Sequence, residues 1–169
     1  MSTLHRRLLA AALGCLALAA LGCEPAPDVE PLPCRIAEAG VSTLGEGDLS
    51  TGYLELDDGQ DLAVSFGPQG MHMVFVSARI SNMEPAQAGG IGNRVSVAIR
   101  LQGEVVGGTV ADMKPSVTDG GISDFLGIRA IITAAEVEDL DGQVTDVEVI
   151  VRDGCGRELA ADRPLRLVL

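Results

Sequence analysis

The most restrictive feature of this sequence is an alternation of apolar and polar residues with a period of two. Residues 94–101 place Val95, Val97 and Ile99 on one face, with polar side chains opposite them. Residues 145–152 and the last five residues repeat the pattern. Because successive side chains of a strand point to opposite faces, this alternation is what a half-buried antiparallel strand requires. The sequence therefore predicts a β domain.

Glycine-containing turn dipeptides separate the alternating segments. They are Asp58-Gly59, Gly107-Gly108, Gly120-Gly121 and Asp141-Gly142, which favour the positive φ angles of tight turns. We expect about eight strands, at 52–57, 61–66, 71–81, 93–102, 104–111, 124–133, 144–152 and 164–169. Short strands at this spacing predict an all-β fold, an antiparallel β-sandwich of immunoglobulin-like general architecture. A short helical turn is expected only within residues 133–140.

Two of the expected strands are apolar on both faces. They contain residues 72–76 and 130–132, and burial of both faces in central strands is the favoured interpretation. The alternative is that Met71, Met73 and Phe75 form an exposed apolar stripe that contacts another molecule.

The first 22 residues are typical of a secretory signal. A short basic segment, residues 5–7, precedes an apolar run at 8–21, which is shorter than the roughly 20 residues of a membrane-spanning helix. The run ends in Ala20-Leu21-Gly22-Cys23, which resembles the bacterial lipobox with its first two residues exchanged. That resemblance implies that Cys23 is lipidated and becomes the first residue of the mature chain. The alternative is ordinary cleavage after Ala19, which would leave Cys23 as an unpaired thiol.

We therefore expect three parts: a lipoprotein signal peptide (1–22), an acylated cysteine with a proline-rich tether (23–33), and one β-sandwich domain (34–169). The lipid would anchor the protein to the bacterial envelope. Glu24 follows the cysteine, and resemblance to enterobacterial sorting signals implies the outer membrane rather than the inner one.

The remaining cysteines are expected to pair. Cys15 leaves with the signal and Cys23 carries lipid, so Cys34 and Cys155 remain, and two thiols in an exported domain indicate a disulfide. A zinc site is disfavoured because no histidines stand at ligand spacing from these cysteines.

Charge argues against two classes of partner. All 24 acidic residues but only ten of the 12 basic ones follow Gly22, so the mature chain carries a net charge of about −14. Nucleic acids and anionic lipid surfaces both require basic patches. Solubility and repulsion at a crowded surface are sufficient reasons for this charge.

An acidic turn offers a candidate calcium site. Aligned on Gly142, the residues Asp139, Asp141 and Glu148 match positions three, five and twelve of an EF-hand loop. Val137 stands at position one and cannot bind calcium, and the flanking segments alternate as strands. An acidic hairpin turn is the favoured interpretation and calcium is the alternative, here and at the residues 57–61.

Catalytic signals are few. His72 is the only histidine after the signal, and the Gly-x-Ser-x-Gly motif of serine hydrolases does not occur. His72 stands between Met71 and Met73, a set of copper ligands, but neighbours on a strand point to opposite faces. We therefore expect a protein that is not an enzyme and needs no cofactor.

One segment resembles a known group of proteins. The run Gly67-Pro68-Gln69-Gly70-Met71-His72-Met73, followed by an apolar strand ending at Arg79, resembles uncharacterised lipoproteins of myxobacterial type. The resemblance implies an exported β-sandwich without an assigned activity. Pro68, Gln69, Gly70 and His72 are interpreted as a turn that braces a hairpin, with a binding motif as the alternative.

Three functions stay open on this basis. The first is a non-enzymatic binding or structural domain at the cell surface, in contact with another envelope protein. The second is a calcium-dependent surface module, and the third is an envelope hydrolase.

Overall fold

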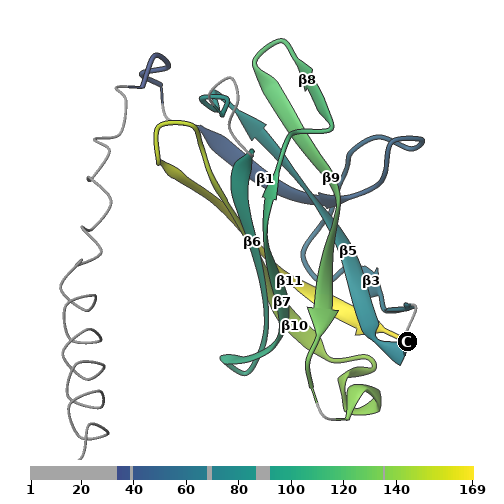
Figure 1. Ribbon diagram of the computed structural model, residues 1–169. Coiled ribbons are helices and arrows are strands. Elements are labelled where there is room, and N and C mark those ends of the chain that lie inside the picture. Colours follow the sequence, from purple (N-terminus) through teal and green to yellow (C-terminus); the bar gives the residue numbers. More distant parts are fainter. Residues whose placement is uncertain (1–33, 39, 68–69, 87–91, 135) are drawn as a thin grey trace, which may run out of the picture. The chain divides into compact units, whose positions relative to one another are not determined.

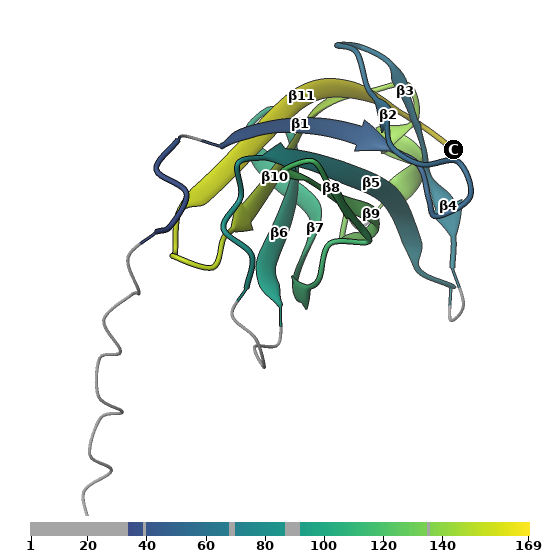
Figure 2. The same cartoon turned by 90° about the horizontal axis from the view of Figure 1, so that it is seen from above.

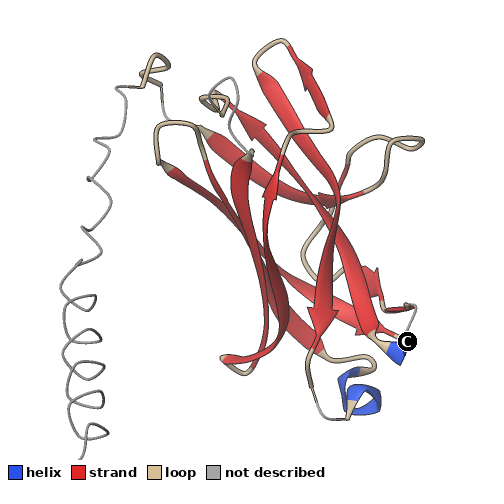
Figure 3. Cartoon of the chain, in the orientation of Figure 1, coloured by secondary structure: helices blue, strands red, loops and turns tan. Residues whose placement is uncertain are grey.

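The computed structural model describes residues 34–38, 40–67, 70–86, 92–134 and 136–169 (Figure 1). The expected signal peptide, the lipidation site Cys23 and the tether lie outside these ranges. The elements are β1 (Val41–Glu46), β2 (Leu54–Glu55), β3 (Asp61–Ala63), β4 (Ser65–Phe66), β5 (His72–Ser81), β6 (Asn93–Leu101), β7 (Glu104–Met113), β8 (Val117–Asp119), β9 (Ile122–Ile132), the 3-10 helix η2 (Val137–Leu140), β10 (Val144–Arg152) and β11 (Glu158–Val168). Figure 3 shows how strongly strands dominate the domain.

The strands form one curled sheet in the order β2-β1-β5-β9-β7-β6-β10-β11-β3, with β4 paired to β5 and β8 paired to β9. Adjacent strands run antiparallel except β11 and β3, which run parallel. The all-β, sandwich-like architecture expected from the sequence is confirmed. It has eleven strands where about eight were expected.

The sheet curls into two layers, and the strand pairing that connects them at its centre, β7 with β9, is short. Strands β7 and β9 pair only through Gly107 and Gly108 with Ile132 and Ile131. One layer contains β1, β5 and β9, and the other contains β7, β6, β10 and β11. The curl also brings β1 alongside β11, so the two ends of the sheet approach each other (Figure 2).

The core lies between the layers and follows the period of two. The inward side chains that the alternation predicted on β6, β10 and β11 are buried: Val95, Val97, Ile99, Val147, Val149, Val151, Leu165 and Leu167. Strands β5 and β9 contribute the opposite wall, with Val74, Val76 and Phe125 almost fully buried. The prediction for Leu169 was wrong, because 48% of its surface is exposed beyond the last strand.

Several strand boundaries differ from the expected ones. Strands β1 and β8 were not expected, and β11 begins at Glu158 instead of residue 164. Strand β11 includes Pro164, which has no backbone N–H to donate. Proline is tolerated there because β3 begins to pair with β11 only at Arg166, and the Pro164 carbonyl accepts a hydrogen bond from Gly59 N.

A β-bulge interrupts the pairing of β5 with β9. Val76 pairs with Ile128 but Ala78 pairs with Phe125, so two residues of β9 lie opposite the single residue Ser77. One of them, Gly127, has a φ of +63°, which an L side chain rarely adopts. The bulge reverses which residues of β9 face the core.

The helical turn expected within residues 133–140 is present as η2. Within the described ranges, no helix is long and apolar enough to cross a membrane.

Candidate functional site

The turn motif singled out in the sequence connects β4 to β5, and Pro68 and Gln69 lie outside the described residues. Gly67 N donates a 2.8 Å hydrogen bond to Met71 O, which closes the turn as a hairpin. The half-buried His72 ring packs edge-on against Phe66, with 5.2 Å between the ring centroids. The described part of the motif therefore acts as a brace for the hairpin, and it holds Phe66 on the surface.

The structure does not bring the three candidate calcium ligands together as a site. Asp139 lies in η2, while an oxygen of Asp141 accepts a hydrogen bond from Leu169 N at 2.9 Å. Glu148 lies on β10 and pairs with Arg100 at 2.8 Å. Within the described residues, no group of three or more His, Cys, Asp or Glu side chains is placed to hold a metal ion.

Carboxylates of the second acidic turn, residues 57–61, also form ion pairs with arginines. Asp58 lies 3.5 Å from Arg163, and Asp61 pairs with Arg166. These carboxylates join the 57–61 turn to β11, which gives the acidic residues of this turn a structural role.

A concave site lies on the outer face of the β1–β5–β9 layer, the face that carries Phe75, Ser77 and Arg79. It arises because β5 changes partner along one edge. Gly45 of β1 pairs with Ser77, and Ser65 of β4 pairs with Met73. Among the described strands, none pairs with residues 74–76 on that edge.

A groove of about 490 Å³ fills the resulting gap. It is lined by the end of β1 and the residues after it (46–48), by Leu62, Ala63 and Ser65 of the β3–β4 segment, by Phe75 of β5 and by Gly127 of the bulge. Phe75 is 44% exposed and presents an aromatic surface at the groove. We call this site the outer-face groove.

Ser77 fixes the base of this region. Its side chain is fully buried, and its Oγ donates to Gly47 O and accepts from Gly127 N, both at 3.1 Å. The hydroxyl therefore ties the loop after β1 to the bulge of β9. Because both contacts are to backbone and the side chain has no solvent access, Ser77 holds the groove in shape and is not placed as a nucleophile.

Asp48 begins a tight loop at the rim of the groove. Its Oδ1 accepts hydrogen bonds from the amides and hydroxyls of Ser50 and Thr51 at 2.7–3.1 Å. These bonds, with the Ser50 hydroxyl first, lower the pKa of Asp48 to about 2. The carboxylate is therefore ionised at any physiological pH. The loop presents Leu49, which is 80% exposed, at its tip.

A second polar group lies further along the same face. Arg79 makes a two-pronged ion pair with Asp124 at 2.8 and 2.9 Å, and its guanidinium lies 4.3 Å from the centroid of the Tyr53 ring. Burial raises the pKa of Tyr53, and a hydrogen bond to Thr43 partly offsets this. A Cβ at Gly45 would lie 2.5 Å from the Tyr53 ring, so glycine is required beneath it.

Aromatic residues are concentrated outside the core. The chain has three Phe, one Tyr and no Trp, and of these four only Phe125 belongs to the core. Phe66 is 73% exposed, Phe75 is 44% exposed and Tyr53 is half-buried under Arg79. Of the proposed stripe of Met71, Met73 and Phe75, only Phe75 is exposed, because Met73 is buried and Met71 half-buried.

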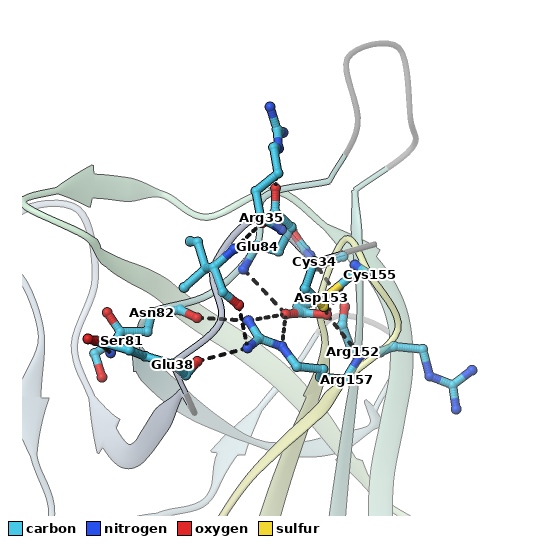
Figure 4. Close-up of polar contacts among 12 residues, drawn as sticks. Cys34, Arg35, Glu38, Ser81, Asn82, Glu84, Arg152, Asp153, Cys155 and Arg157 are labelled. Carbon is cyan, nitrogen blue, oxygen red and sulfur yellow. Dashed lines mark hydrogen bonds and ion pairs between the residues drawn. A yellow bond between two sulfur atoms is a disulfide. The ribbon is translucent and has the colours of Figure 1, made fainter. Parts of the chain in front are cut away.

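At the other end of the domain, the expected disulfide between Cys34 and Cys155 is present, with 5.3 Å between the Cα atoms. It joins the first described residue to the turn between β10 and β11 (Figure 4). The polar groups beneath it are Glu84, Asp153 and Arg157. We call these five residues the N-terminal clamp.

Asp153 is the centre of the clamp, with a fully buried side chain. Its carboxylate accepts hydrogen bonds from Arg157 Nε at 2.8 Å and from the amides of Cys155, Arg157 and Glu84. A buried carboxylate is tolerated only when it is paired and hydrogen-bonded in this way.

Arg157 connects the clamp to the N-terminal segment, residues 36–38. Beyond its ion pair with Asp153, its guanidinium donates to the backbone carbonyls of Ile36, Glu38 and Asn82 at 2.9–3.1 Å (Figure 4). One side chain thereby holds three chain segments together.

Glu84 completes the clamp from the segment after β5. Its carboxylate accepts hydrogen bonds from the amides of Arg35 and Ile36 and from Arg35 Nε at 2.9–3.1 Å. Burial acts to raise the pKa of Glu84, but the hydrogen bonds from Arg35 and Ile36 outweigh it and the pKa is lowered.

Sequence reasoning missed both the outer-face groove and the polar part of the clamp. The signal for the groove was the position of Phe75 on a predicted strand, in a chain with only four aromatic residues. Local alternation carries no signal for the clamp, because its residues are separated by up to 121 positions.

Comparison with known proteins adds no relative. No protein family model matches this chain, and a search of curated proteins gives no match.

Proposed function

We propose that this chain is an exported, lipid-anchored protein of the bacterial envelope, and that its β domain binds another envelope protein without catalysing a reaction. The observation that carries the binding role is the outer-face groove, which is lined by Phe75 with 44% of its surface exposed. Aromatic side chains, phenylalanine among them, are enriched in protein interfaces relative to the rest of the protein surface.

Export and anchoring rest on the sequence of residues 1–23 and are supported by the disulfide. A Cys34–Cys155 bond persists in an oxidising compartment, which an exported domain reaches. Lipidation of Cys23 would place the tether immediately before the clamp. Any pull on the tether would then pass through Cys34 into the β10–β11 turn instead of peeling β1 from the sheet. The lipid on Cys23 would itself make the contact with the membrane, and the outer membrane is the expected location.

The binding role is tested by photo-crosslinking on intact cells that display the full-length, lipidated protein. A photoreactive phenylalanine analogue replaces Phe75 in one variant and Val105 in a control. Val105 is 61% exposed but lies on β7, in the other layer of the sheet, and does not line the groove. We expect a reproducible protein adduct, identified by mass spectrometry, from position 75 and not from position 105. Equal adducts from both positions, or lipid adducts alone, would overturn the binding role.

Anchoring is tested separately by cell fractionation of a Cys23→Ser variant. We expect the wild-type chain in the membrane fraction and the variant in the soluble fraction. Retention of the variant in the membrane fraction would show that Cys23 does not carry the anchor.

A further inference from the structure

We infer that the outer-face groove receives a lysine or arginine side chain from an extended segment of the partner protein. This inference rests on the proposed binding function and names the chemistry of the partner. The groove combines an aromatic wall, small residues and carboxylates at one rim, a combination suited to a side chain with an apolar stem and a cationic end.

The apolar part of the site is formed by Leu62, Phe75 and three residues with little or no side chain. These three are Gly47, Ala63 and Gly127, and beside them the groove lies close to the backbone. A cavity of about 490 Å³ is large enough for a long side chain and the backbone that carries it. The aliphatic stem would pack against Phe75, and the ring face would attract the cation.

The charged part is the rim formed by Glu46 and Asp48. All four hydrogen bonds to Asp48 end on Oδ1, and within the described residues none reaches Oδ2. Glu46 pairs with Leu54 through its backbone, and its side chain forms no hydrogen bond or ion pair with the described residues. The rim therefore offers charged oxygen atoms that an incoming cation can pair with.

The surrounding charge has the same sign. The net charge is −12, and a field of that sign draws a basic segment toward the surface. Two arginines lie on this face: Arg79 is paired with Asp124, whereas Arg129 lies opposite Phe75 in the register of β5 with β9 and is exposed. Arg129 does not line the groove, but its positive charge would repel a bound cation. Removing this charge should therefore strengthen binding, whereas removing a carboxylate should weaken it.

The test uses four heptapeptides of alternating Thr and Val that differ only in the central residue: Lys, Arg, Leu or Glu. Each is titrated into the isotopically labelled, full-length protein in detergent micelles at low salt, and the amide NMR signals of Gly47, Ala63 and Gly127 are followed. We expect saturable shifts with the Lys and Arg peptides, weaker binding of the Leu peptide and no binding of the Glu peptide.

Substitutions of single charged residues then test which carboxylates contribute to binding of the Lys peptide. Asp48→Asn, which keeps an oxygen for the loop hydrogen bonds, and Glu46→Gln should each weaken Lys-peptide binding about threefold, as expected for a solvent-accessible ion pair. Arg129→Gln should strengthen it. Asp146→Asn, a matched loss of charge on β10, should leave it unchanged.

Two results would overturn the inference: binding of the Glu peptide as tight as that of the Lys peptide, or equal effects of Asp146→Asn and Asp48→Asn. Its failure is distinguishable from failure of the proposed function. A protein adduct at position 75 without Lys-peptide binding refutes the basic partner alone. Lys-peptide binding without any adduct on cells refutes the envelope partner and leaves the groove chemistry standing.

Discussion

The polar groups of the N-terminal clamp and those of the outer-face groove differ in burial and in hydrogen bonding. In the clamp, the carboxylate of Asp153 is fully buried and its hydrogen bonds are supplied by the chain itself. In the groove, Asp48 keeps one oxygen without a partner among the described residues, and Phe75 is 44% exposed. Buried polar groups must be satisfied internally, whereas open ones are available to another molecule. We therefore expect the clamp to stabilise the domain, and the groove is the site at which we propose that it binds another molecule.

The largest expected effect is on the covalent part of the clamp. Replacing both Cys34 and Cys155 with alanine should lower the free energy of unfolding by about 4 kcal/mol, because the bond closes a loop of roughly 120 residues in the unfolded chain. Urea unfolding of the full-length protein measures this, with reduced wild type as the matched sample. A loss below about 1 kcal/mol would show that the bond contributes little to the clamp.

Breaking the ion pair beneath the disulfide should have the next largest effect. Arg157→Met leaves the carboxylate of Asp153 buried without its partner and should cost about 3 kcal/mol. Arg163→Met is the control, since Arg163 lies 3.5–3.8 Å from two exposed carboxylates and should contribute less than about 1 kcal/mol. Similar losses for the two variants would contradict a special role for the buried pair.

The third prediction concerns the pH dependence of the clamp. The pKa of Glu84 is lowered in the folded state, so its stabilising contribution is complete above the ordinary value of 4.5 and is lost as the pH falls through the folded value. The unfolding free energies of wild type and Glu84→Gln should therefore differ at pH 6 and converge toward pH 2. A difference that stays constant over this range would mean that the ionised carboxylate does not stabilise the clamp.

The smallest expected effect on stability is at the groove. Phe75→Ala should change the unfolding free energy by less than about 1 kcal/mol, because much of the ring is already in water. The same change should clearly weaken the binding of the Lys peptide to the groove. Phe125→Ala, at a fully buried position, should cost about 3–5 kcal/mol. If Phe75→Ala destabilised the fold as much, the ring would belong to the core instead of to a binding surface.

Alternation predicted the parts of the fold that depend on local burial. Val95, Val97 and Ile99 face the core as expected, because each strand buries one face independently of its partners. The curl of the sheet was not predictable, since it depends on the two-residue joint of β7 with β9 and on Gly127 in the bulge. Strand β1 was missed because it contains Gly45, whose role depends on the distant packing of Tyr53.

Prediction of the sites from the sequence had the same limit, because it used only local information. Cysteine counting predicted the pairing of Cys34 with Cys155, because a disulfide needs only two thiols and an oxidising compartment. The calcium interpretation of Asp139, Asp141 and Glu148 relied on spacing along the chain. Glu148 instead turns to Arg100 across the β10–β6 pair, a partner 48 residues away. Spacing within one segment cannot reveal such a competitor.

The most direct test of the division between clamp and groove is amide hydrogen exchange of the lipidated protein, compared in detergent micelles and in isolated envelope membranes. We predict that the membranes slow exchange at residues 46–48, 63–66 and 127, around the groove, and leave residues 34–38 and 153–157 of the clamp unchanged. Slower exchange at the clamp with no change around the groove would contradict the account, because the binding surface would then lie at the opposite end of the domain.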